Sequence, residues 1–71
     1  MNFTLSETRE PGTYKPVLAG DRRTAIVICP QCGSRLHLSP HIVLDNGVVT
    51  PSVVCRPPCE FHEFITLDGW R

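Results

Sequence analysis

The amino-acid sequence predicts a single small β-rich domain whose fold is stabilised by a bound metal ion. Three observations support this prediction: the chain has 71 residues, it carries four cysteines in two close pairs, and short β-branched runs precede the pairs. A chain of this length buries only about 60% of the surface that its unfolded form exposes. Scaffolds this small usually need disulfides, a metal or oligomerisation to stay folded, so the cysteines are the natural source of extra stability.

The charge balance argues against a protein that binds nucleic acid mainly by contacting the phosphate groups of the nucleic acid. Seven basic and seven acidic residues give a formal net charge of zero, whereas such proteins usually carry a basic patch. No apolar run approaches the roughly 20 residues that span a bilayer, and the polar segment 1–10 has no signal-peptide core. We therefore expect a cytoplasmic protein without membrane contact. In that reducing compartment, paired cysteines are more often metal ligands than disulfides.

The first part of the chain differs from the rest. Residues 1–23 contain prolines, glycines and scattered polar residues, and they show no helix or strand periodicity. We expect an extended or partly ordered N-terminal arm over 1–23, followed by the metal-stabilised domain over 24–71. Phe3, Tyr14 and the pair Val17–Leu18 are apolar enough to dock on the core of that domain.

Two copies of a strand–cysteine turn–strand unit are expected in the domain, which gives four strands. The β-branched run 24–28 leads into the first cysteine pair, and 34–38 follows that pair with alternating apolar and polar residues. The run 51–54 leads into the second cysteine pair, and the last strand, 60–67, follows that pair. Its alternation places Ile65 and Leu67 on one face, which we expect to be the buried face.

The segment 39–50 fits two local structures. Ser39 can cap a short helix that has Pro40 at its first position, and we favour one helical turn followed by a bend. The alternative is a hairpin in which Asn46 and Gly47 form a two-residue type I′ turn between two short strands.

The cysteine spacing is the clearest functional pattern in the sequence. Cys29 and Cys32 form a C-x2-C pair, and Cys55 and Cys59 follow after 22 residues as a C-x3-C pair. This spacing fits a zinc ribbon, in which two cysteine turns on separate hairpins converge on one ion. Four thiolates favour zinc, with iron as the alternative, and disfavour magnesium or calcium. A closed tetrahedral site has no open position for catalysis, so we expect no enzyme activity.

The two cysteine turns differ in their expected support. In the first turn, Gly33 can adopt a positive φ without a Cβ penalty. The second turn is one residue longer, and its prolines at 57–58 offer no N–H to the sulfur atoms. We therefore expect the second turn to be the less hydrogen-bonded half of the site. His62 follows Cys59 by three positions and is the alternative fourth ligand.

Several short stretches resemble known zinc-ribbon proteins. The sequence CPQCG at 29–33 resembles the knuckle of zinc-ribbon and rubredoxin-like proteins, and the wider segment 26–70 is similar to small zinc-ribbon proteins encoded in tailed-bacteriophage and prophage genomes. The stretches that carry this similarity are Cys29–Gly33, Asp45–Gly47, Pro51–Cys55, Phe61–Phe64 and Gly69–Trp70. The resemblance implies a zinc-ribbon fold and, for a phage protein, the cytoplasm of a bacterial host. It implies no particular activity.

Three other functions match parts of the sequence. C-x2-C also occurs in thiol oxidoreductases, but there a helix lowers the cysteine pKa, whereas strand-like residues follow Cys32. Four thiolates also suit a rubredoxin-like iron electron carrier. Arg22, Arg23 and Arg35 flank the first turn, as in a zinc ribbon that binds nucleic acid. We favour a module that binds another protein, because acidic residues around the last strand would repel phosphate.

The partner surface is expected on the C-terminal strand and tail. Phe64 lies on the strand face opposite Ile65 and Leu67, and Trp70 follows the last expected turn. Exposed aromatic residues of this kind are enriched at binding hot spots. We therefore predict Phe64 and Trp70 as partner-binding residues. The alternative is that the N-terminal arm, through Tyr14, folds over both of them.

Overall fold

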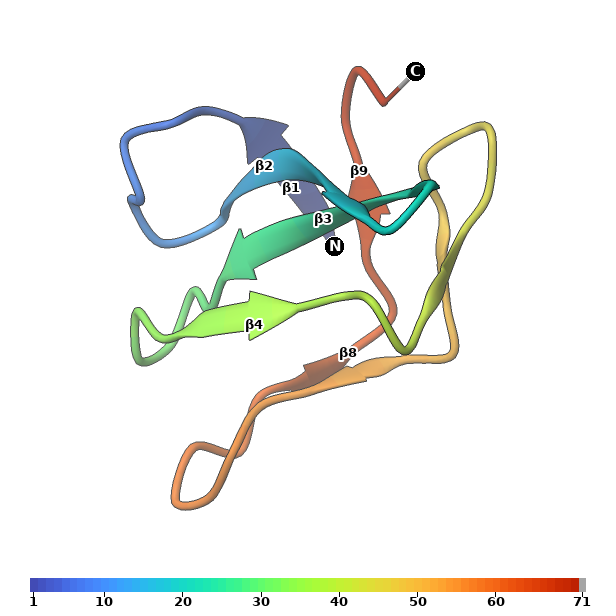
Figure 1. Ribbon diagram of the computed structural model, residues 1–71. Coiled ribbons are helices and arrows are strands. Elements are labelled where there is room, and N and C mark those ends of the chain that lie inside the picture. Colours follow the sequence, from blue (N-terminus) through green and yellow to red (C-terminus); the bar gives the residue numbers. More distant parts are fainter. Residues whose placement is uncertain (71) are drawn as a thin grey trace.

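The computed structural model describes residues 1–70, which form nine short β-strands joined by turns and loops (Figure 1). Five strands form one sheet in the order β4-β3-β2-β1-β9, and the others form the pairs β5–β6 and β7–β8. No segment of residues 1–70 forms a helix long and apolar enough to cross a membrane. The expected β-rich character is confirmed. The strands are β1 (Asn2–Leu5), β2 (Thr13–Ala19), β3 (Arg22–Ile28), β4 (Arg35–His37), β5 (Ile42–Val43), β6 (Val49–Thr50), β7 (Val53–Val54), β8 (His62–Glu63) and β9 (Thr66–Leu67).

The hairpin of β2 and β3 is the longest paired unit of the sheet. Six residue pairs join these two strands, and three more join β3 to β4, among them Val27 opposite Leu36. β3 is rich in β-branched residues, which fit a pleated and half-buried surface. The strands predicted at 24–28 and 34–38 therefore correspond to β3 and β4, although β3 begins two residues earlier.

The N-terminal segment lies inside the sheet, whereas the sequence predicted an extended or partly ordered arm over 1–23. β1 pairs in parallel with β2 on one side and with β9 on the other, and Phe3 and Tyr14 are 0% and 1% exposed. The sequence pattern missed these strands because burial along β2 does not alternate. Thr13 and Tyr14 are both buried, and the next two residues are both exposed.

Residues 39–50 form a hairpin, so the favoured helical turn is wrong. β5 and β6 pair antiparallel, with Val43 opposite Val49. The hairpin is preferred because this pairing places Val49 in the core, where it is 0% exposed. The Leu44 N–H donates to the Val48 carbonyl at 2.8 Å, which leaves the three-residue loop 45–47, and the Gly47 N–H donates to the Leu44 carbonyl at 2.8 Å. A type I′ turn needs a positive φ at both of its central residues. In this loop only Gly47 has a positive φ, +88°. The two-residue type I′ turn of the alternative prediction is therefore also absent from residues 39–50.

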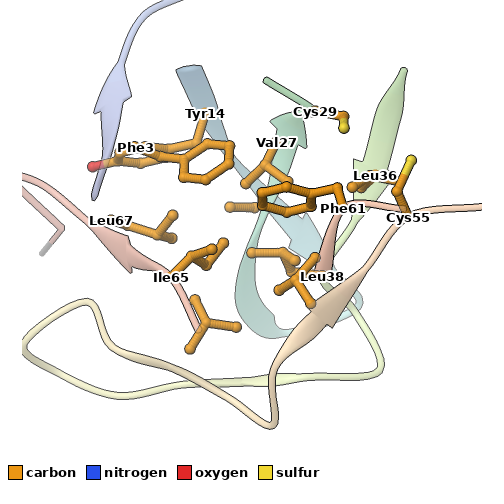
Figure 2. Packing of buried hydrophobic residues seen from close by; sticks show 13 residues of the cluster. Phe3, Tyr14, Val27, Cys29, Leu36, Leu38, Cys55, Phe61, Ile65 and Leu67 are labelled. Atoms are coloured by element: carbon orange, nitrogen blue, oxygen red, sulfur yellow. The ribbon is translucent and has the colours of Figure 1, made fainter. Parts of the chain in front are cut away.

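The buried side chains form one cluster between the five-stranded sheet and the segments that carry β6, β7 and β8 (Figure 2). Its largest members are aromatic, and the rings of Phe3 and Phe61 meet edge-on with centroids 6.3 Å apart. The cluster therefore draws on both ends of the chain. Its members are Phe3, Tyr14, Ala25, Val27, Cys29, Leu36, Leu38, Val49, Val53, Cys55, Phe61, Ile65 and Leu67.

The strand expected over 60–67 is divided into β8 and β9. β8 pairs with β7, and the chain then leaves that pair so that β9 lies beside β1. Ile65 and Leu67 are each 1% exposed, as their alternation predicted, and Phe64 is 70% exposed. The alternation gave the correct faces, but it carries no information about which strand becomes the neighbour.

Gly47 determines how closely the β5–β6 hairpin approaches β9. Its carbonyl accepts a hydrogen bond from the Leu67 N–H at 2.8 Å. A Cβ atom on Gly47 would collide with the Leu67 backbone oxygen and would lie 3.1 Å from the Trp70 Cβ. The positive φ of this residue also disfavours any side chain. Both the close approach and the backbone conformation therefore require glycine here.

Gly47→Ala is expected to destabilise the fold more than the matched control Gly20→Ala. Both glycines have a positive φ, +88° and +65°, so both variants suffer the left-handed penalty of about 1–2 kcal/mol. A Cβ on Gly20 has no neighbour within 4 Å, so only Gly47→Ala also suffers the collision, which adds about 1–3 kcal/mol. Urea unfolding measures the difference, and equal unfolding free energies would contradict the close approach.

Candidate metal centre

Backbone hydrogen bonds close the first cysteine turn. Cys29 follows β3 directly, and its N–H donates to the Ser34 carbonyl at 2.9 Å. The Cys29 carbonyl in turn accepts a hydrogen bond from the Gly33 N–H at 2.9 Å. Gly33 has a φ of +76°, the left-handed conformation that glycine adopts without a Cβ penalty. This turn holds Cys29 and Cys32 at one end of the main sheet.

The second cysteine turn repeats this arrangement with one more residue. Cys55 follows β7, and its N–H donates to the Phe61 carbonyl at 3.0 Å, six positions downstream, whereas the equivalent bond in the first turn spans five. The extra residue is accommodated by a tight turn in which the Cys59 N–H donates to the Arg56 carbonyl at 3.0 Å. The longer C-x3-C spacing therefore still directs both sulfur atoms toward the first turn.

The structure brings all four predicted cysteines together. Their Sγ atoms lie within 4.8 Å of one another. Two close contacts run between the turns, Cys29 to Cys59 at 3.6 Å and Cys32 to Cys55 at 3.5 Å. A tetrahedron with Zn–S bonds of ~2.3 Å places sulfur atoms about 3.8 Å apart, whereas a disulfide bond measures ~2.05 Å. The four free thiols thus have the spacing of a metal site.

The sulfur cluster lies at the boundary between the core and solvent. Cys29 and Cys55 are 0% and 3% exposed and belong to the hydrophobic cluster. Figure 2 shows Cys55 at the edge of that cluster, near Leu36 and Phe61. Cys32 is exposed and Cys59 is half-buried. An ion bound here would therefore have two ligands inside the core and two at the surface.

The thiols differ in acidity. Hydrogen bonding with the Ser34 hydroxyl, and then with the Ser34 N–H, lowers the pKa of Cys32 to about 6. Burial, followed by contact with the Cys32 thiol, raises the pKa of Cys55 to about 12. The Phe61 N–H lowers the pKa of Cys59, but burial and the neighbouring thiols outweigh it, so that pKa is raised. The close packing of the four thiols therefore disfavours ionisation of all of them at once. A bound divalent cation would favour that ionisation, because it stabilises the thiolates that coordinate it.

In each turn, a backbone N–H lowers the pKa of the second cysteine. The donors are the N–H groups of Ser34 for Cys32 and of Phe61 for Cys59, in each case two positions downstream. The sequence predicted that the prolines at 57–58 would leave the second turn less hydrogen-bonded. This difference in hydrogen bonding between the two turns stays a prediction.

His62, the alternative fourth ligand, lies outside the sulfur cluster. It is exposed on β8, and its Nε2 lies 2.7 Å from the Ser52 Oγ. Within the part of the chain that the structure describes, the only group of His, Cys, Asp or Glu side chains placed to share one ion is the set of four cysteines. The structure thus gives His62 a hydrogen-bond partner away from the thiols.

The two aromatic residues predicted to bind a partner have different surroundings. Phe64 is 70% exposed. Trp70 is half-buried against the core, with its ring 6.2 Å from the Tyr14 ring and the Arg23 guanidinium 4.7 Å above its centre. The Tyr14 hydroxyl donates to the Asp68 carbonyl at 2.5 Å and holds the last turn against β2. Tyr14 and Arg23 therefore cover part of Trp70 and leave Phe64 exposed.

Comparisons of the chain with protein-family models, with curated proteins and with solved structures gave no significant match. The fold and the site themselves define a small β-rich domain in which four cysteines lie within metal-binding distance. This cluster suggests a zinc-ribbon-like domain. The similarity to phage-encoded zinc ribbons rests on the sequence stretches alone.

Cys59→Ser is expected to weaken zinc binding far more than His62→Ala. Serine replaces a soft ligand in the sulfur cluster, whereas His62 contacts Ser52 instead of the thiols. Loss of a group that only supports a ligand lowers affinity roughly 10–100-fold, and loss of Cys59 itself should exceed that range. A competition titration against a chromophoric chelator measures both affinities. A larger effect of His62→Ala would move the fourth ligand from Cys59 to His62.

Proposed function

We propose that this chain binds one zinc ion through its four cysteines and that the ion has a structural role. The observation that carries the proposal is the sulfur cluster, whose Sγ atoms lie within 4.8 Å of one another. Four thiolates complete the tetrahedral coordination of zinc, so no position remains for a substrate or an attacking water. The arrangement therefore supports a structural function better than catalysis. The ligands are Cys29, Cys32, Cys55 and Cys59.

Zinc is preferred over iron because closed four-cysteine sites are typical of structural zinc. Iron is the alternative ion, since the same four thiolates also hold iron in electron-transfer sites. Zinc has no redox chemistry, so the purified protein should be redox-silent if zinc is the native ion. Metal analysis of protein expressed without added metal distinguishes the two.

The ion would join two parts of the molecule that no strand ladder connects. Cys29 and Cys32 lie between β3 and β4 of the five-stranded sheet, whereas Cys55 and Cys59 lie between β7 and β8, which form a separate two-stranded sheet. Within residues 1–70, the second sheet is linked to the first by the short connection from β8 to β9, by side-chain packing and by the sulfur cluster. A metal that cross-links them would act as the staple that small domains need.

One zinc per chain is expected, and strong chelation is expected to unfold the residues predicted as the domain, 24–68, together with β1 and β2, because these strands pair with β9 and β3. Structural zinc contributes apparent binding free energies of about 10–16 kcal/mol in finger-sized peptides, which matches or exceeds the whole stability of a typical domain, about 5–15 kcal/mol. Amide NMR spectra recorded before and after metal removal give the result. A dispersed spectrum that survives complete removal of the ion would contradict a structural role.

We also propose that the domain acts by docking on a larger protein and that Phe64 lies at the contact. Phe64 is 70% exposed, and Met1, whose nitrogen lies 3.2 Å from the Phe64 carbonyl, is 53% exposed. Phe and Met are among the residue types enriched at protein–protein interfaces. An accessory role in a phage-infected bacterium, and a location in its cytoplasm, are further parts of this proposal that follow from the sequence resemblance.

Phe64→Ala is expected to abolish capture of a partner and to leave the melting temperature unchanged, because little of its side chain is buried. Trp70→Ala is expected to lower stability by about 1–2 kcal/mol, because it removes the contacts with Tyr14 and Arg23. Pull-down from a bacterial lysate and thermal unfolding measure the two effects, with metal-free protein as the control. Unchanged capture by Phe64→Ala would remove this residue from the interface.

A further inference from the structure

A small cavity lies on the face of the main sheet that points away from the hydrophobic core. Val27 and Leu36 pair across β3 and β4 and belong to the core cluster. Side chains alternate between the two faces of a sheet, so Ile26, Ile28 and Arg35 point to the other face. These three residues line a cavity of about 130 Å³. The cavity therefore lies mainly on the face opposite the core, and Tyr14 is the one member of the core cluster in its lining.

Three cations surround this cavity. Arg9 comes from the loop between β1 and β2, Lys15 from β2 and Arg35 from β4. Glu7 is the one carboxylate in the lining, so three positive groups and one negative group leave a net formal charge of +2. No carboxylate within residues 1–70 forms an ion pair with any of the three cations. Positive charges gathered around a cavity favour binding of an anion.

The loop that closes one side of the cavity is held at both ends. The Ser6 N–H donates to the Tyr14 carbonyl at 3.1 Å, and the Gly12 N–H donates to the Ile28 carbonyl at 2.9 Å. Arg9, within this loop, has a φ of +63° and is the one non-glycine residue of the described chain with a positive φ. Such conformations persist where the surrounding structure imposes them, and they are common at ligand sites. The loop thus presents the Arg9 guanidinium from a fixed backbone.

We propose that this cavity binds a single phosphate group, either as free phosphate or at the end of a small phosphomonoester. Its volume of about 130 Å³ exceeds the space of one ordered water, about 30 Å³. It is smaller than the roughly 300–1,000 Å³ of pockets that hold whole cofactors, so one chemical group fits. A phosphomonoester carries about −1.5 to −2 charges at pH 7, which balances the net charge of the lining.

The types of side chain also suit phosphate. The planar guanidinium groups of Arg9 and Arg35 can each donate two hydrogen bonds to phosphate oxygens, and Lys15 adds a point charge. A phosphodiester in nucleic acid carries a single charge and continues on both sides, so it matches the charge and size of the cavity less well. The inference depends on the outer face of the sheet and is independent of the metal proposed for the cysteines.

Titration of the metal-loaded full chain with inorganic phosphate, followed by calorimetry, tests the proposal. Arg35→Gln should weaken phosphate binding about tenfold or more, because it removes charge-assisted hydrogen bonds. The matched control Arg22→Gln removes the same charge from the neighbouring strand β3 outside the cavity, and it should change the affinity less than twofold. Glu7→Gln should tighten binding severalfold, because it removes the one negative charge in the lining.

Arg9→Gly separates a binding role from a purely structural role of this loop. Glycine tolerates the positive φ of position 9, so the variant should melt at the same temperature as the parent or higher while it binds phosphate about tenfold more weakly. Unchanged phosphate affinity in this variant would overturn the role of Arg9. Because Glu7→Gln and Arg9→Gly are expected to keep the fold, the test remains decisive even if Arg35→Gln unfolds.

Three ligands distinguish the source of the phosphate group. Tighter binding of phosphoserine than of inorganic phosphate indicates a phosphomonoester, and the reverse indicates free phosphate. A single-stranded oligonucleotide should bind more weakly than either of them, with no difference between the Arg35→Gln and Arg22→Gln variants. Failure of both phosphate and phosphoserine to bind at millimolar concentration, or equal weakening by Arg35→Gln and Arg22→Gln, would overturn the proposal.

Discussion

The convergence of two cysteine turns on one point is the constraint on which the rest of the structure depends. It holds the β7–β8 pair against a sheet with which that pair shares no ladder. Cys29 and Cys55 are also members of the hydrophobic cluster. The same two residues therefore take part in both the sulfur cluster and the core. In a chain with so little surface to bury, each of these contacts serves both the site and the fold.

Strand β3 connects two surfaces of different chemistry. On one side, Val27 faces the core and leads into Cys29 at the sulfur cluster. On the other side, Ile26 and Ile28 form the wall of a small cavity that cations surround. The alternation of a single strand thus separates the face that leads into the sulfur cluster from the face that borders the cation-lined cavity. A change at one of these residues can alter one surface while its neighbours maintain the other.

Sequence reasoning succeeded where the determining interactions are local. The spacing of the cysteines located the sulfur cluster, and alternation identified Ile65 and Leu67 as buried. It failed where distant partners decide. The helix-capping preference of Ser39 is overridden because hairpin pairing buries Val49, and the strand at the N-terminus exists only because β2 and β9 flank it.

The position of β1 between β2 and β9 has a consequence for synthesis on the ribosome. β1 and β2 emerge early, but the second edge of β1 acquires its partner only when Thr66 and Leu67 have been made. Until then, that edge presents unpaired N–H and C=O groups, which can recruit strands of other chains. A chain truncated just before β9 would keep all four cysteines and still expose this edge. The last strand therefore covers an edge that stays open throughout the synthesis of the preceding residues, in addition to completing the sheet.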